Sequence, residues 1–138
     1  MAYWLIKSEP DAFSWDEQVA NGVEPWTGVR NHQAKKNLAG MKLGDRAFFY
    51  HSNIQRAIVG VVEIVREAYP DLTAESGNWV CVDVKAIGPM PNPVTLADIK
   101  QDAALADLAL VRQSRLSVCP VSAEHWRHLC QMGGWTGD

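Results

Sequence analysis

The chain has 138 residues, of which 47% are hydrophobic and 21% charged, so it has the composition of an ordinary globular protein and the length of one domain. No apolar run approaches the roughly 20 residues needed to cross a bilayer, and the N-terminus lacks the basic and apolar segments of a signal peptide. The three cysteines, Cys81, Cys119 and Cys130, are odd in number and have no C-x-x-C spacing, which argues against a disulfide framework. We therefore expect one cytoplasmic domain, residues 1–138, with reduced thiols.

The net charge of −3 hides an uneven distribution along the chain. Between Gly28 and Arg66 there are seven basic and two acidic residues, whereas the rest of the chain carries six basic and fourteen acidic ones. A basic region on an acidic body is typical of a local anion-binding site, and a solvated helix face also accounts for part of it. Charge alone leaves both interpretations open.

The first half of the chain predicts a strand followed by two helices. Ala2 to Lys7 is the strand. Ser14 and Glu17 form a capping box at the start of a helix that ends at Gly22. Asn31 is the expected N-cap of the second helix, which runs through HQAKKNLAGM.

Three strands are expected next. They are RAFFYHS from Arg46, AIVGVVEIV from Ala57 and WVCVDVKAI from Trp79. The first and third alternate between two faces, and the second is apolar on both faces, as expected for a central strand. Short turns between successive strands favour antiparallel pairing.

The C-terminal part predicts a helix, a strand and a final helix. Thr95 caps a short helix through VTLADIKQ, RLSV from Arg115 to Val118 is the last strand, and Ser122 caps a helix that ends at glycine. The complete order favours the α+β class rather than a doubly wound sheet. Five or six short strands around one core favour a small, partly closed, mainly antiparallel β-barrel flanked by helices.

We expect no cofactor and no metal site. His125, His128 and Cys130 lie close together in the last helix, but Cys130 points away from the two histidines and no second cluster supplies further ligands. The sequence also lacks a G-x-S-x-G elbow and a glycine-rich phosphate loop. Glu9 and His51 form an acid–base pair only in an alternative interpretation, in which the protein is a hydrolase acting on nucleic acid or a nucleotide.

The segment EPWTGVRNHQAKKNL, Glu24 to Leu38, contains the strongest binding signal. Trp26 lies between a proline and a small Thr-Gly pair, so a flat ligand could approach its indole closely. Arg30 and Asn31 offer donors, and the start of the helix that Asn31 caps favours anions. A stacking face, a polar edge and a phosphate contact are the parts needed to hold one nucleotide. The other interpretation makes Trp26 a core side chain and Arg30 part of a surface ion pair.

Six blocks of sequence together resemble the EVE domain family. They appear in the family's order and cover almost the whole chain: YWLIKSEP at Tyr3, WTGVRNHQAKKNL at Trp26, MKLGDRAFFYHSN at Met41, EAYPD at Glu67, PVTLADIK at Pro93 and RQSRLSVCPVS at Arg112. Any one block alone is weak, whereas the set is specific. The chain departs from the family at Thr27, where the family often has aspartate.

The resemblance implies a PUA-like fold, close to that of YTH domains. It also implies a nucleic-acid partner, DNA or RNA, recognised through a modified base, above all a modified cytosine in DNA, flipped into an aromatic-lined pocket. Tyr69 or Tyr50 would be the second aromatic wall beside Trp26. The expected base-binding residues are Lys7, Ser8, Trp26, Gly28, Val29, Arg30, Asn31, Tyr50, His51, Ser52 and Tyr69. The expected phosphate-binding residues are Lys35, Lys36 and Arg115.

Energetics limit what such a pocket achieves. Stacking of a base on Trp26 is worth about 1–3 kcal/mol. Burying one extra methyl group is worth about 0.8 kcal/mol, only about a fourfold preference. A nucleic-acid binder loses affinity as salt rises, which separates it from a further alternative, a protein-interaction domain that presents an aromatic patch.

Overall fold

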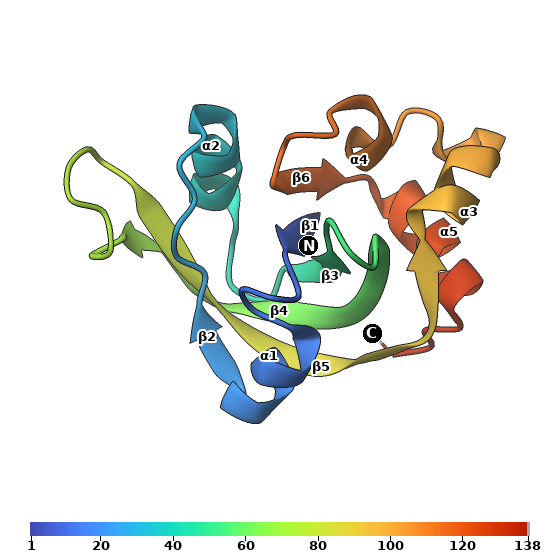
Figure 1. Cartoon of the computed structure of the whole chain (residues 1–138), viewed down its shortest axis with the longest axis horizontal. Coiled ribbons are helices and arrows are strands. Elements are labelled where there is room, and N and C mark those ends of the chain that lie inside the picture. The colour runs from blue at the N-terminus through green and yellow to red at the C-terminus, as the bar shows by residue number, and fades with distance from the viewer. Residues whose placement is uncertain (138) are drawn as a thin grey trace.

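The computed structural model describes residues 1–137, in which six strands form one mixed sheet (Figure 1). The strands pair in the order β2-β5-β4-β3-β1-β6. Their bounds are Tyr3–Ser8 (β1), Val23–Pro25 (β2), Arg46–His51 (β3), Ala57–Pro70 (β4), Val80–Thr95 (β5) and Val118–Val121 (β6). The helices are Trp15–Asn21 (α1), His32–Gly40 (α2), Leu96–Gln101 (α3), Ala109–Arg112 (α4) and Ala123–Gly133 (α5), with a 3-10 turn at Ala103–Leu105 (η1).

The α+β class is confirmed, but the sheet is neither closed nor purely antiparallel. Strands β1 and β3 are parallel, because α1, β2 and α2 lie between them in the chain and carry it back to the same end of the sheet. The other four strand pairs are antiparallel. The edge strands β2 and β6 are not paired with each other, so the expected partly closed barrel is corrected to an open, strongly curved sheet (Figure 1).

The helix starts follow the capping signals of the sequence. The Ser14 side chain accepts a hydrogen bond from the Glu17 amide, and the Glu17 carboxylate accepts one from the Ser14 amide, so the capping box is confirmed. The Asn31 side chain caps α2 by accepting from the Ala34 amide at 2.9 Å. Thr95 and Ser122 cap α3 and α5 in the same way.

Several elements differ from the sequence prediction near prolines. Strand β5 continues past Ile87 to Thr95 through Pro89, Pro91 and Pro93, and β6 contains Pro120 and begins at Val118 instead of ending there. Strand β6 is an edge strand, where proline is tolerated because the missing amide faces no partner. The short β2, η1 and α4 were not predicted.

The core lies on both sides of β3 and fixes the position of the site. Phe48 and Phe49 are neighbours that point to opposite faces, and both are fully buried. On one face Phe48 stacks on Trp126 of α5, with ring centroids 3.8 Å apart. On the other face the ring of Phe49 packs edge-to-face with the rings of Trp15 and Trp26, with ring centroids 5.3 and 5.5 Å apart. The second face therefore anchors Trp26, which follows β2. None of the helices in residues 1–137 combines the length and apolar character needed to span a membrane.

Candidate functional site

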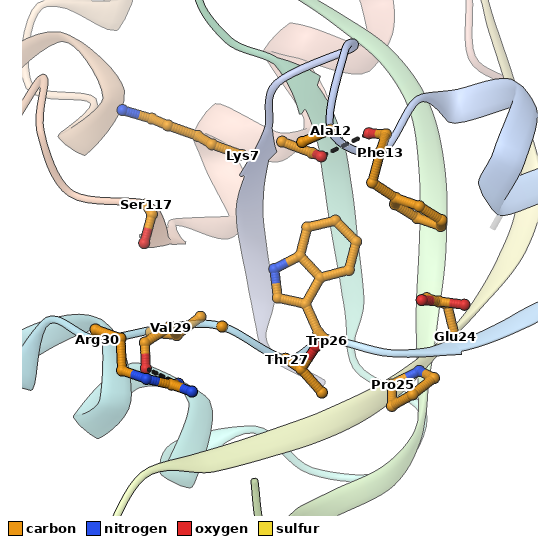
Figure 2. Close-up of a pocket in the computed structure, with 12 residues that line it drawn as sticks. Lys7, Ala12, Phe13, Glu24, Pro25, Trp26, Thr27, Val29, Arg30 and Ser117 are labelled. Atoms are coloured by element: carbon orange, nitrogen blue, oxygen red, sulfur yellow. Dashed lines mark hydrogen bonds between the residues drawn. The ribbon is translucent and has the colours of Figure 1, made fainter. Parts of the chain in front are cut away.

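A pocket of about 430 Å³ opens beside Trp26, between the end of β1, the α1 entry loop and the segment after β2 (Figure 2). Its lining is Lys7, Ser8, Ala12, Phe13, Glu24, Pro25, Trp26, Thr27, Gly28, Val29, Arg30 and Ser117. This volume falls in the range of pockets that hold small organic ligands, about 300–1,000 Å³. Figure 2 shows the indole of Trp26 rising into the middle of this group.

Trp26 is at once a core side chain and a pocket wall. Its amide donates to the Val82 carbonyl at 2.7 Å, which extends the β2–β5 pairing by one residue. The residue is 7% exposed, and its ring packs edge-to-face with that of Phe49. Trp26 therefore combines the two roles considered from the sequence, a core side chain and a wall of the pocket. The core holds that wall in place.

Phe13 is the second aromatic residue of the pocket, and it was not predicted from the sequence. Its ring stands edge-on to Trp26, with centroids 6.1 Å apart and planes at 76°. The Ser8 hydroxyl donates to the Phe13 carbonyl at 2.5 Å and so ties the α1 entry loop to the end of β1. The one signal available was the position of Phe13 directly before the N-cap Ser14, where a hydrophobic residue often packs on its own helix and not on a ligand.

Arg30 closes one side of the pocket through an ion pair with a buried carboxylate. Its Nη1 donates to Asp71 Oδ2 at 3.0 Å, and its Nη2 donates to the Thr73 hydroxyl at 3.1 Å. Asp71 has no exposed side-chain surface and also accepts from the Gly28 amide at 2.9 Å. Burial alone would raise the Asp71 pKa, but hydrogen bonds from Thr73, Gly28 and Arg30 outweigh it and hold that pKa well below its usual value. The pair joins the Trp26 segment to the loop between β4 and β5.

Lys7 borders the pocket with its aliphatic part and carries its charge elsewhere. Its Nζ donates to the Ser114 carbonyl at 2.9 Å, and Figure 2 shows the ammonium end lying away from the Trp26 ring. Burial lowers the Lys7 pKa from its usual value. The Lys7 amide donates to the Ser117 carbonyl at 3.0 Å, which holds the segment before β6 against the pocket.

The EVE domain model matches residues 2–132 of the chain. The chain belongs to the EVE domain family. It is 34% identical to human thymocyte nuclear protein 1 over an alignment of 159 positions, which covers 91% of this chain and 71% of the human protein. The chicken protein is 35% identical over 158 positions, covering 90% of this chain and 65% of the chicken protein. The chain thus spans about two thirds of the length of these curated relatives.

Solved structures share the fold over nearly the whole chain. A Rhodopseudomonas palustris protein solved by NMR is 58% identical with a TM-score of 0.93, covering 100% of this chain and 97% of that one. Human thymocyte nuclear protein 1 in complex with DNA containing 5-methylcytosine is 32% identical with a TM-score of 0.92, covering 96% and 98%. The YTH domain of the Zygosaccharomyces rouxii MRB1 protein, in complex with N6-methyladenosine RNA, has a TM-score of 0.61 at 15% identity, covering 96% and 86%. That last likeness concerns the fold alone and is consistent with a PUA-like fold.

The expected base-binding residues of this EVE domain fall into separate places. Six of them line the pocket: Lys7, Ser8, Trp26, Gly28, Val29 and Arg30. Tyr50 and Ser52 line a neighbouring cavity instead. His51 is buried and lines neither cavity; its Nε2 accepts from the Trp15 amide at 2.9 Å and its Nδ1 pairs with Gln55 Oε1 at 2.6 Å. Because both ring nitrogens are used, His51 has no free nitrogen for a base edge or for proton transfer with Glu9.

Tyr69 lies outside the pocket lining. Its hydroxyl donates to Asp83 Oδ1 at 2.5 Å, and the Arg66 guanidinium covers its ring at 3.6 Å from the centroid. The hydrogen bond to Asp83 raises the Tyr69 pKa, as does burial. Phe13 therefore stands where Tyr69 or Tyr50 was expected.

Asn31 and the expected phosphate-binding residues lie around α2. Asn31 and Arg115 line a shallow cavity of about 370 Å³ at the N-terminus of that helix. Lys35 lies with its Nζ 5.8 Å from the centre of the Trp79 ring, on which His32 also stacks, while Lys36 is exposed. Within residues 1–137 there is no group of three or more His, Cys, Asp or Glu side chains that could hold a metal ion. His128 pairs with Asp102 at 2.6 Å.

Proposed function

We propose that this EVE domain binds a nucleic acid by taking one modified base into the pocket beside Trp26, and that the base is a modified cytosine in DNA. The observation that carries the proposal is a preformed pocket in which an anchored indole stands among small and polar side chains. A base stacked on such a ring gains about 1–3 kcal/mol, independent of sequence. Thr27 and Gly28 add little bulk at the rim, so a planar ring has room to approach.

The nearest experimental support comes from a relative. Human thymocyte nuclear protein 1, whose structure in complex with 5-methylcytosine-containing DNA has a TM-score of 0.92 to this chain, shares 32% of its residues. Taking a base out of a duplex costs a few kcal/mol, so a single strand or a mismatched site should bind more tightly than a paired one. We propose in addition that the chain acts as one domain in the cytoplasm, where its three cysteines stay reduced.

The test measures fluorescence anisotropy with labelled oligonucleotides that differ only in one 5-methylcytosine. Single-stranded and duplex DNA are compared with RNA of the same sequence. The key variant is Ala12→Trp, because Ala12 is an exposed loop residue at the pocket (Figure 2), and a large ring there fills the space without disturbing the core. The matched control is Ala106→Trp, the same change at an exposed position outside the pocket lining.

We expect native protein and Ala106→Trp to prefer the methylated strand by about fourfold, the amount that one buried methyl group supplies. Ala12→Trp should abolish that preference. Equal binding of both strands by native protein, or a preference that survives Ala12→Trp, would refute the proposal.

A further inference from the structure

A second cavity, also of about 430 Å³, is lined by residues of β1, the β3–β4 turn, α3 and α4 and shares Lys7 with the first. Three cationic side chains from three separate segments line it: Lys7 from β1, Arg56 from the turn and Lys100 from α3. Polar groups complete the lining with Ser52, Asn53, Ser114, Tyr50 and one carboxylate, Glu9, and the rest is Leu96 and Leu110. The balance of charge favours an anion.

The turn that forms one wall of this cavity has an unusual backbone. Asn53 and Arg56 have φ angles of 70° and 53°, which side chains other than glycine rarely adopt. Arg56 Nε donates to the Asn53 carbonyl at 3.1 Å, and the Arg56 carbonyl accepts from the Leu96 amide at 2.8 Å. Hydrogen bonds thus hold an arginine in a conformation that costs free energy, and such positions concentrate at binding sites.

Lys7 links the two cavities, because it lines both. Its ammonium group has three N–H donors, and the Ser114 carbonyl takes one of them at 2.9 Å. Ser114 is itself part of the second cavity, and the ammonium end of Lys7 lies away from the indole (Figure 2). A partly buried ammonium in this position stabilises a ligand that brings negative charge.

We propose that the second cavity binds a phosphate group through Lys7, Arg56 and Lys100. On a nucleic acid this is the backbone phosphate next to the nucleotide held beside Trp26, and that source rests on the proposed function. A free phosphorylated small molecule presents the same group. In both cases the phosphate is held by charge and hydrogen bonds that carry no sequence information.

Two exposed lysines provide a matched test of the proposal. Lys100→Glu reverses a charge in the second cavity, and Lys85→Glu reverses one on β5, outside the lining of either cavity. Both residues are exposed, so both variants should fold. Binding of methylated and unmethylated single strands is measured for each variant at several salt concentrations. In parallel, inorganic phosphate is titrated while the NMR signals of the Ser52 and Asn53 amides are followed.

We expect Lys100→Glu to weaken both strands equally, by about fivefold, and to lower the salt slope by about 0.7 for one lost phosphate contact. Lys85→Glu should change affinity less than twofold. Inorganic phosphate should shift the Ser52 and Asn53 signals in native protein and not in Lys100→Glu. If phosphate shifts these signals while strand affinity is unaffected, the cavity takes a free phosphorylated ligand. Equal effects of the two variants on strands, with no shift by phosphate, would overturn the proposal.

The outcome is separate from that of the base pocket. Failure of the proposed function appears as equal affinity for methylated and unmethylated strands, a ratio that Lys100→Glu leaves unchanged. Failure of the phosphate site appears as equal strand affinity in Lys100→Glu and Lys85→Glu, with the ratio preserved and no shift of the Ser52 and Asn53 signals by inorganic phosphate. The two results therefore distinguish loss of the base pocket from loss of the phosphate site.

Discussion

Replacing Asp71 with asparagine tests whether the ion pair between Arg30 and the buried Asp71 carboxylate holds the pocket segment in place. In the native protein Asp71 accepts from the Gly28 amide and from Arg30 on one oxygen, and from the amide and hydroxyl of Thr73 on the other. An asparagine keeps one acceptor and must point its NH₂ group at the other pair of donors. If the amide oxygen stays on Thr73, the NH₂ group meets the Gly28 amide and the Arg30 guanidinium.

The expected cost follows from these contacts. A hydrogen bond to a charged group is worth about 1.5–3 kcal/mol, and two are lost. The Arg30 side chain is 37% exposed, so water restores part of its solvation, whereas the Asp71 position is fully buried. We therefore expect Asp71→Asn to lower the free energy of unfolding by about 3 kcal/mol at neutral pH. Arg30→Gln, which leaves Asp71 with its bonds to Gly28 and Thr73, should cost less, about 1 kcal/mol.

The assay is urea unfolding followed by circular dichroism, repeated from neutral pH down to about pH 3. The folded-state pKa of Asp71 lies below its unfolded value, so the stabilisation is complete above about pH 4 and is lost as the pH falls further. The difference between native protein and Asp71→Asn should therefore shrink in acid. A cost below about 1 kcal/mol, or a gap that stays constant with pH, would refute this account of the ion pair.

Three further predictions concern the fold. Gly60→Ala should destabilise the protein by about 2 kcal/mol in the same urea assay, since a Cβ atom at Gly60 would lie 2.5 Å from the Trp15 ring; an unchanged midpoint would contradict the packing. Asn31→Ala should lower the free energy of unfolding by about 1 kcal/mol, because it removes the cap of α2, whereas Asn31→Asp should keep most of the native stability. Equal losses in the two variants would show that the cap does not stabilise the helix. Cys119 and Cys130 are buried, which raises each thiol pKa to about 11, so Ellman's reagent should label them slowly at about pH 8 until urea unfolds the chain.

The sequence predicted best what depends on neighbouring residues. The caps at Ser14, Asn31 and Ser122 are correct because the bonds that define them join residues three positions apart. Strand ends near prolines were less well predicted, since whether Pro120 fits depends on β6 being at the edge of the sheet. The parallel pairing of β1 with β3 likewise depends on how the intervening helices pack, which no local pattern records.

The site was predicted in part for the same reason. Trp26 and its immediate neighbours form one continuous segment, so the motif that contains them also brings them together. Phe13 reaches the pocket from another part of the chain, and Asp71, which holds Arg30 in place, lies 41 positions further along the sequence than Arg30. Tyr69 had the right residue type, but Asp83 and Arg66 on its own hairpin already engage it. Residue type alone cannot separate an aromatic ring that is free to bind from one that is occupied.

The rigidity of Trp26 bears on how the protein would discriminate between bases. Because Phe49 packs against the indole and the Trp26 backbone amide is bonded to the Val82 carbonyl, binding a base orders little of the protein, so most of the stacking energy appears as affinity. Stacking and phosphate contacts act alike on modified and unmodified strands, whereas a methyl group adds only about 0.8 kcal/mol. Selectivity greater than this requires that an unmodified base leave a void or an unpaired group. Under the two proposals, substitutions around Lys100 should therefore change total affinity, and substitutions around Phe13 and Ala12 should change the preference for the modified base.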